Sequence, residues 1–72
     1  MAKTIYSLTH LTDEWHIHCY AEDADHIFAV KTHIASGDEA KKFALLEAMR
    51  HKPSEVIEIG ASGIPVKLAA FE

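Results

Sequence analysis

Hydrophobic residues recur at every second position in the first half of this 72-residue chain, until the period changes near residue 36. The alternating segments are residues 3–11, 15–21 and 27–34. Alternation of this kind is typical of half-buried strands in an antiparallel sheet. The short polar breaks at 12–14 and 23–26 are typical of hairpin turns. The chain is therefore predicted to begin with a three-stranded meander.

A helix is predicted directly after the third strand. Ser36 can cap its N-terminus, and Glu39 follows three residues later, which is the capping-box pattern. Residues 40–49 are almost all good helix formers. Pro53 ends the helix, and the basic residues just before it suit the negative end of the helix dipole.

The C-terminal residues predict a second hairpin. Segments 55–60 and 64–71 are strand-like and are joined by residues 61–63. Pro65 has no N–H group, so the last strand is expected at an edge of the sheet. The expected fold is a single small α+β domain over residues 1–72, in which an antiparallel β-sheet (β-β-β-α-β-β) has one helix packed on one face.

The register of the meander follows from keeping its hydrophobic side chains on one face. A two-residue turn between the first two strands places Tyr6 opposite Cys19 on the inner face. A four-residue loop between the second and third strands places Cys19 opposite Val30. On the outer face, the same alignment places His16 opposite His33.

The chain contains one cysteine, Cys19, which excludes an intramolecular disulfide. Small secreted domains usually depend on disulfides, so we expect a cytoplasmic protein. Hydrophobic residues make up 49% and charged residues 25%, which is the balance of a soluble globular domain rather than a disordered or membrane-spanning segment. The net charge of −4 argues against a direct nucleic-acid binder, which would carry a basic stripe.

Six histidines supply the first candidate site. His16 and His18 share the outer face of the second strand, and the predicted register brings His33 near them. Three imidazoles on one face can hold Zn²⁺ with an open fourth position, which a carboxylate or Tyr20 would complete. The alternative is a solvated polar face, because the chain lacks the HExxH and paired-cysteine spacings of common zinc sites. We expect no cofactor, with Zn²⁺ at these histidines as the alternative.

Acidic residues gather in one stretch of the chain and form the second candidate site. Seven of the eleven lie within residues 13–39, where only Lys31 opposes them, so this span carries a charge of −6. They are Asp13, Glu14, Glu22, Asp23, Asp25, Asp38 and Glu39. Such residues can dock onto a basic protein surface, because complementary charge speeds and orients the encounter. The alternative is ordinary turn and helix-cap chemistry, divided between the two ends of the sheet.

The predicted helix supplies a third candidate surface. The stripe expected to face the core is Ala44, Leu45, Ala48 and Met49. Phe43 and Leu46 point elsewhere, and apolar residues over more than half of the circumference indicate two neighbours. The second neighbour is the C-terminal hairpin, a second copy of the chain or a protein partner, for which Phe43 and Leu46 would be anchors.

Catalysis is poorly supported by the pattern of residues. Cys19 is expected on the inner face, where a thiol is inert. Ser7 and Thr9 lie near the histidines of the outer face, but no carboxylate is placed to orient a histidine, and no glycine-rich turn offers an oxyanion hole. We therefore expect a protein that is not an enzyme.

The sequence favours a small, non-enzymatic acidic protein that occupies a surface of a larger protein, without direct contact with nucleic acid or membranes. Its expected partner-binding residues are Asp13, Glu14, Glu22, Asp23, Asp25, Phe43 and Leu46. In size and charge the chain is similar to small inhibitors and adaptors encoded by phages and mobile elements, including anti-CRISPR proteins. The target of such an inhibitor would be a basic surface that normally binds nucleic acid. The alternatives are a metal- or small-ligand-binding domain built on the histidine face, and a structural homodimer joined through the helix or an edge strand.

Overall fold

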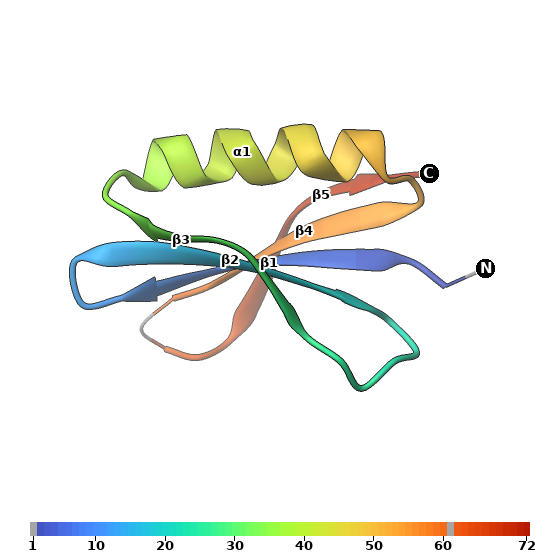
Figure 1. Ribbon diagram of the computed structural model, residues 1–72, viewed down its shortest axis with the longest axis horizontal. Coiled ribbons are helices and arrows are strands. Elements are labelled where there is room, and N and C mark those ends of the chain that lie inside the picture. The colour runs from blue at the N-terminus through green and yellow to red at the C-terminus, as the bar shows by residue number, and fades with distance from the viewer. Residues whose placement is uncertain (1, 61) are drawn as a thin grey trace.

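The computed structural model describes residues 2–60 and 62–72, which form five strands and one helix. The elements are β1 (Thr4–Leu11), β2 (Glu14–Ala21), β3 (Phe28–Ile34), α1 (Gly37–Arg50), β4 (Ser54–Ile59) and β5 (Pro65–Phe71). Their order along the chain is the predicted one. Figure 1 shows α1 lying across one face of the sheet, so the fold has two layers and leaves the other face of the sheet without a helix.

The sheet is mixed, which corrects the prediction of a purely antiparallel sheet. Its strands follow the order β3-β2-β1-β4-β5, and β4 pairs with β1 in parallel. The physical reason is the length of α1. Its 14 residues span about 21 Å, close to the length of the seven-residue strand β3. The helix therefore carries the chain back to the end of the sheet where β1 begins, and β4 runs in the direction of β1 (Figure 1).

The C-terminal hairpin forms as predicted, with β5 at an edge of the sheet and Pro65 as its first residue. The predicted turn at 61–63 includes Ala61, which lies outside the described residues. The N–H group of Gly63 donates a hydrogen bond to the carbonyl of Gly60 at 3.0 Å. Gly63 has a φ of 77°, in the left-handed region that a residue without a side chain enters freely.

The first hairpin has the predicted register. Tyr6 pairs with Cys19, and Leu8 pairs with Ile17. In the two-residue turn, Thr12 has a φ of 55°, the left-handed conformation that turns of this length require. The inner face of this hairpin is therefore hydrophobic, and its outer face is polar.

The register between β2 and β3 is correct at one end and wrong at the other. Near the start of β2, Trp15 pairs with Ile34, as the predicted alignment requires. Near its end, Cys19 pairs with Phe28 instead of Val30. Two irregularities in the ladder each add one residue to β3, and such bulges cannot be found by counting alternate positions.

The hydrophobic core lies between α1 and the sheet. Three strand residues and three helix alanines are fully buried there: Leu8, Ile17, Val56, Ala40, Ala44 and Ala48. The alanines are four residues apart, so they form one stripe that lets the helix lie close to the strands. The predicted core stripe is confirmed at Ala44 and Ala48 but is wrong at Met49, which is exposed because the buried stripe continues through Ala40 instead.

Both ends of α1 are fixed by side-chain hydrogen bonds. The hydroxyl of Ser36 accepts a hydrogen bond from the N–H group of Glu39 at 3.3 Å, which confirms the predicted N-cap. At the other end, the buried hydroxyl of Ser54 donates to the carbonyl of Ala48 at 2.5 Å. This second bond ties the last turn of the helix to the start of β4.

Candidate functional site

Glu14, His16 and His33 bring three potential metal-ligating atoms together on the helix-free face of the sheet. The Oε2 atom of Glu14 lies 2.6 Å from Nε2 of His16 and 2.6 Å from Nδ1 of His33. All three atoms lie within 4.8 Å of one another. One carboxylate oxygen and two imidazole nitrogens are a donor set that suits divalent transition metals.

The backbone explains how these three side chains meet. Residues two apart on a strand point to the same side, so Glu14 and His16 share one face of β2 while Ile17 points into the core. His33 comes from the neighbouring edge strand β3. It lies at a ladder irregularity and has a φ of 59°, a left-handed conformation that is uncommon outside glycine.

His18, the third histidine of the predicted metal site, does not join the cluster. Its ring stacks on the ring of His16, with centroids 6.3 Å apart, and it lines a neighbouring cavity. Glu14 is the third member of the cluster, although the sequence pattern places it among the acidic residues expected to bind a partner. The spacing of Glu14 two residues before His16 on one strand face is the signal that could have revealed it.

The cluster contains an ionised carboxylate at neutral pH. The hydrogen bond to His16 is the main cause that lowers the pKa of Glu14, and the nearby His33 adds to the effect. The His16 ring is largely covered, whereas 76% of the His33 side chain is exposed. Solvent can therefore reach the cluster from the side of β3.

A cavity of about 380 Å³ adjoins the cluster on the same face of the sheet. It is lined by Ser7, Thr9, His18, Tyr20, Ile27 and Ile59. Thr9 pairs with His16 across β1 and β2, which places one wall of the cavity next to the cluster. A small molecule or a partner side chain in this cavity would lie beside the three potential ligands.

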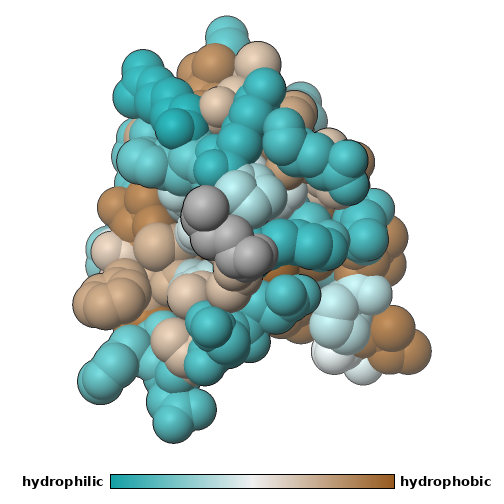
Figure 2. Space-filling view, turned by 90° about the vertical axis from the view of Figure 1, so that its right-hand side faces the viewer, coloured by the Kyte–Doolittle hydropathy of each residue, from teal (hydrophilic) through white to brown (hydrophobic). Residues whose placement is uncertain are grey.

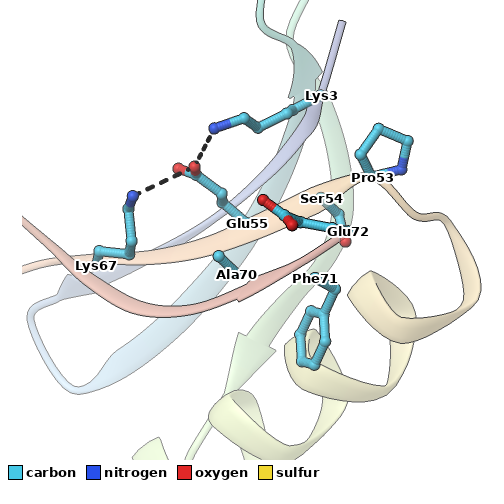
Figure 3. Close-up of a pocket in the computed structure, with 8 residues that line it drawn as sticks. All are labelled: Lys3, Pro53, Ser54, Glu55, Lys67, Ala70, Phe71 and Glu72. Carbon is cyan, nitrogen blue, oxygen red and sulfur yellow. Dashed lines mark hydrogen bonds and ion pairs between the residues drawn. The ribbon is translucent and has the colours of Figure 1, made fainter. Parts of the chain in front are cut away.

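A second cavity, of about 490 Å³, lies where β1 begins and β5 ends. Figure 3 shows Lys3 and Lys67 converging on the carboxylate of Glu55 at its side. Their Nζ atoms lie 2.5 Å and 3.3 Å from Oε2 of Glu55. Because Glu55 pairs with both cations, the two ion pairs link β4 to Lys3, just before β1, and to Lys67 in β5. The positive charge of the two lysines is therefore balanced by a carboxylate and does not form an anion site.

Replacing Glu55 with glutamine should make the protein less sensitive to acid. Hydrogen bonds from Lys3 and then Lys67 lower the pKa of Glu55 below its ordinary value of 4.5. A carboxyl group whose pKa is lower in the folded state stabilises the fold above about pH 4.5, and this contribution is lost as the pH falls through the folded value. The free energy of unfolding, measured by urea titration between about pH 7 and pH 3, should fall less in Glu55→Gln than in the unmodified protein.

Asp25→Asn, which removes one exposed carboxylate, is the control for this experiment. Its pH profile should stay close to that of the unmodified protein. A Glu55→Gln profile parallel to that of the unmodified protein would show that the two lysines do not stabilise the carboxylate.

The predicted acidic residues divide between the two ends of the sheet. Asp13 lies in the β1–β2 turn, at the end where α1 begins with Asp38 and Glu39 in its first turn. The β2–β3 loop lies at the opposite end, where the chain termini are (Figure 1). The acids of this loop are Glu22, Asp23 and Asp25, and all three are exposed. The alternative of two acidic patches is therefore the arrangement in the structure.

Exposed hydrophobic side chains accompany the acids at the β2–β3 loop. Ile27 is 65% exposed and Phe28 is 62% exposed, and only His26 separates them from Asp25. The end of the molecule that carries this loop faces the viewer in Figure 2, where hydrophilic side chains dominate and hydrophobic ones emerge in separate groups. This loop, residues 22–28, combines negative charge with exposed apolar surface.

The two predicted helix anchors have different surroundings. Phe43 is partly buried against the core, and the ammonium group of Lys31 lies 4.9 Å from the centre of its ring. Leu46 is exposed. The pair therefore does not form one apolar patch, and only Leu46 is freely accessible.

Cys19 is half-buried on the helix side of the sheet, as predicted. Burial raises the pKa of its thiol, and the carboxylate of Glu47 adds to the effect. A thiol with a raised pKa stays protonated at neutral pH and is a poor nucleophile.

Comparison of the chain with protein-family models, with curated proteins and with solved structures finds no match. Within residues 2–60 and 62–72, no helix has the length and hydropathy needed to cross a membrane. The assignment of function therefore depends on the two surfaces described above, the loop of residues 22–28 and the Glu14–His16–His33 cluster.

Proposed function

We propose that this protein is a cytoplasmic, non-enzymatic inhibitor or adaptor that docks the loop of residues 22–28 onto a basic surface of a larger protein. The observation that carries the proposal is the exposure of Ile27 and Phe28 beside three exposed carboxylates. Apolar groups of this size on a surface are typical of binding sites, and aromatic anchors often dominate the binding energy.

The loop is held in place for such a role. Its first turn is closed by a hydrogen bond from the N–H group of Ala24 to the carbonyl of Ala21, at 3.1 Å. At its other end, Phe28 pairs with Cys19 in the sheet. A side chain that is already positioned loses less conformational entropy on binding, so Phe28 is suited to be the anchor.

The charges of the loop indicate the chemistry of the partner. Glu22, Asp23 and Asp25 lie within four residues of one another, and no lysine or arginine lies in this loop. Complementary lysine and arginine side chains on a partner would raise the association rate and orient the complex. A surface that normally binds nucleic acid has this chemistry, so occupation of that surface is the form of inhibition we propose.

Replacing Asp23 and Asp25 with lysine should weaken binding to the partner by at least about tenfold, because two attractive charge contacts become repulsive. The measurement uses tagged unmodified protein and the tagged Asp23→Lys/Asp25→Lys variant. Each is incubated with nuclease-treated lysate of the source cells, and captured proteins are quantified by mass spectrometry. The captured protein should also be released by added double-stranded DNA, which competes for the same basic surface.

The control is Asp13→Lys/Asp38→Lys, which makes the same change in net charge at the opposite end of the sheet. It should retain the partner. Loss of the partner from this control but not from the loop variant would contradict the proposed docking site. Absence of any stoichiometric partner would contradict the proposed function itself.

A further inference from the structure

We propose that Glu14, His16 and His33 form a binding site for Zn²⁺, with water as the fourth ligand. This inference is independent of the docking function, because the cluster lies at the opposite end of β2 from the loop of residues 22–28. Three protein ligands of the His/His/Glu type with one open position are a known arrangement for zinc.

The distances fit a metal ion with small adjustments. Zinc binds imidazole nitrogen and carboxylate oxygen at about 2.0–2.2 Å, so two ligands of a tetrahedral site lie about 3.3 Å apart. Glu14 lies 2.6 Å from both histidine nitrogens, and the three ligand atoms lie within 4.8 Å of one another. An ion between them requires the carboxylate to move away from each ring by less than about 1 Å.

The backbone conformation of His33 supports a role for its side chain. A φ of 59° is uncommon for any residue other than glycine, although asparagine, aspartate and histidine adopt it more often than the rest. Unusual backbone conformations of this kind gather at binding sites, where they aim a side chain. At this bulge, Nδ1 of the largely exposed His33 lies beside the same oxygen of Glu14 that His16 contacts.

The charges around the cluster also favour a dication. The chain carries a net charge of −4. Two neutral imidazoles and one carboxylate leave a zinc ion with a net charge of +1, which the acidic protein partly balances. The largely covered His16 ring is held by its stack on His18, so one ligand is already oriented.

The test is isothermal titration of the full chain with Zn²⁺ at pH 7.5. We expect one zinc ion per chain with micromolar affinity. His33→Asn removes the imidazole but keeps a residue that tolerates positive φ, so the variant should fold normally. It should bind zinc about 100-fold more weakly or not at all, since even the outer partners of metal ligands change affinity by 10–100-fold. Glu14→Gln should have a similar effect.

Two controls separate this site from other histidines. His26→Ala removes an exposed histidine of the β2–β3 loop and should leave zinc affinity unchanged. His18→Ala should weaken binding far less than His33→Asn, because His18 orients His16 without ligating the metal. With Co²⁺ in place of zinc, the unmodified protein should give the intense visible absorption of a tetrahedral site, and His33→Asn should lose it.

Several results would overturn the proposal. No zinc binding by the unmodified protein at micromolar concentrations is the first. A stoichiometry of one zinc ion per two chains would place the ion between copies instead of within one cluster. Equal loss of affinity in His18→Ala and His33→Asn would replace this site with the three-histidine site that the sequence suggests.

Discussion

Leu8→Ala should lower the free energy of unfolding by about 2–5 kcal/mol, the usual cost of removing a large aliphatic side chain from a close-packed core. Leu8 is fully buried at the centre of β1, with Ile17 beside it on β2. A domain of this size has a total stability of only about 4–11 kcal/mol, so the variant would lose a large part of it. The measurement is urea or thermal unfolding followed by the fluorescence of the single tryptophan.

Leu11→Ala is the matched control, because it makes the same chemical change in the same strand. Leu11 is 49% exposed at the end of β1, so its truncation should cost less than about 1 kcal/mol. The melting temperature of Leu8→Ala should therefore be lower than that of the control by about 4–8 °C for each kcal/mol of difference. Equal melting temperatures would show that the core is not centred on Leu8.

Those parts of the fold that depend on local patterns are predictable from the sequence. The strand pairs of the first hairpin follow from one constraint, because a shift of one residue would turn Tyr6 and Leu8 away from the core. The helix start at Ser36 follows from the hydrogen bond that only a few side chains can supply. In both cases, residues that are close together in the sequence determine the local structure.

Two other features depend on distant residues, so local patterns do not reveal them. The parallel pairing of β4 with β1 results from where the helix ends relative to the strands. The two bulges in β3 shift its register against β2 by two residues between Trp15 and Cys19. Phe28 consequently pairs with Cys19 and lies exposed next to the acidic loop.

The same bulges explain why the candidate metal site was predicted only in part. The sequence indicated a histidine cluster on the outer face, with an unspecified carboxylate or Tyr20 to complete it. His33 lies at one of these bulges and meets Glu14 and His16, so the cluster forms at the start of β2 rather than around His18.

Trp15→Ala should be the most disruptive change at the end of the sheet where the helix begins. The indole ring stacks on the ring of His10, with centroids 4.5 Å apart and planes 6° from parallel. The indole also lies against Gly37, the first residue of α1. A Cβ atom added at Gly37 would lie only 3.0 Å from the indole ring. Truncation removes the surface on which the helix start rests, and we expect a loss of about 3 kcal/mol.

A second pair of variants tests the contact between Trp15 and Gly37 directly. Gly37→Ala places a methyl group against the indole, and a close-packed contact of this kind resists added volume. In the background of Trp15→Phe, the smaller ring leaves room for that methyl group. Gly37→Ala should therefore be more favourable in the Trp15→Phe background than in the unmodified protein, with a coupling energy of about 0.5–3 kcal/mol.

Far-UV circular dichroism is the suitable readout for these variants, because Trp15→Ala and Trp15→Phe remove the only tryptophan. Gly60→Ala is the matched control, since an added Cβ there meets no atom within 4 Å. Its effect should be the same in both backgrounds. Additive effects of Trp15→Phe and Gly37→Ala would mean that the helix start does not rest on the indole, and that the capping by Ser36 alone sets its position.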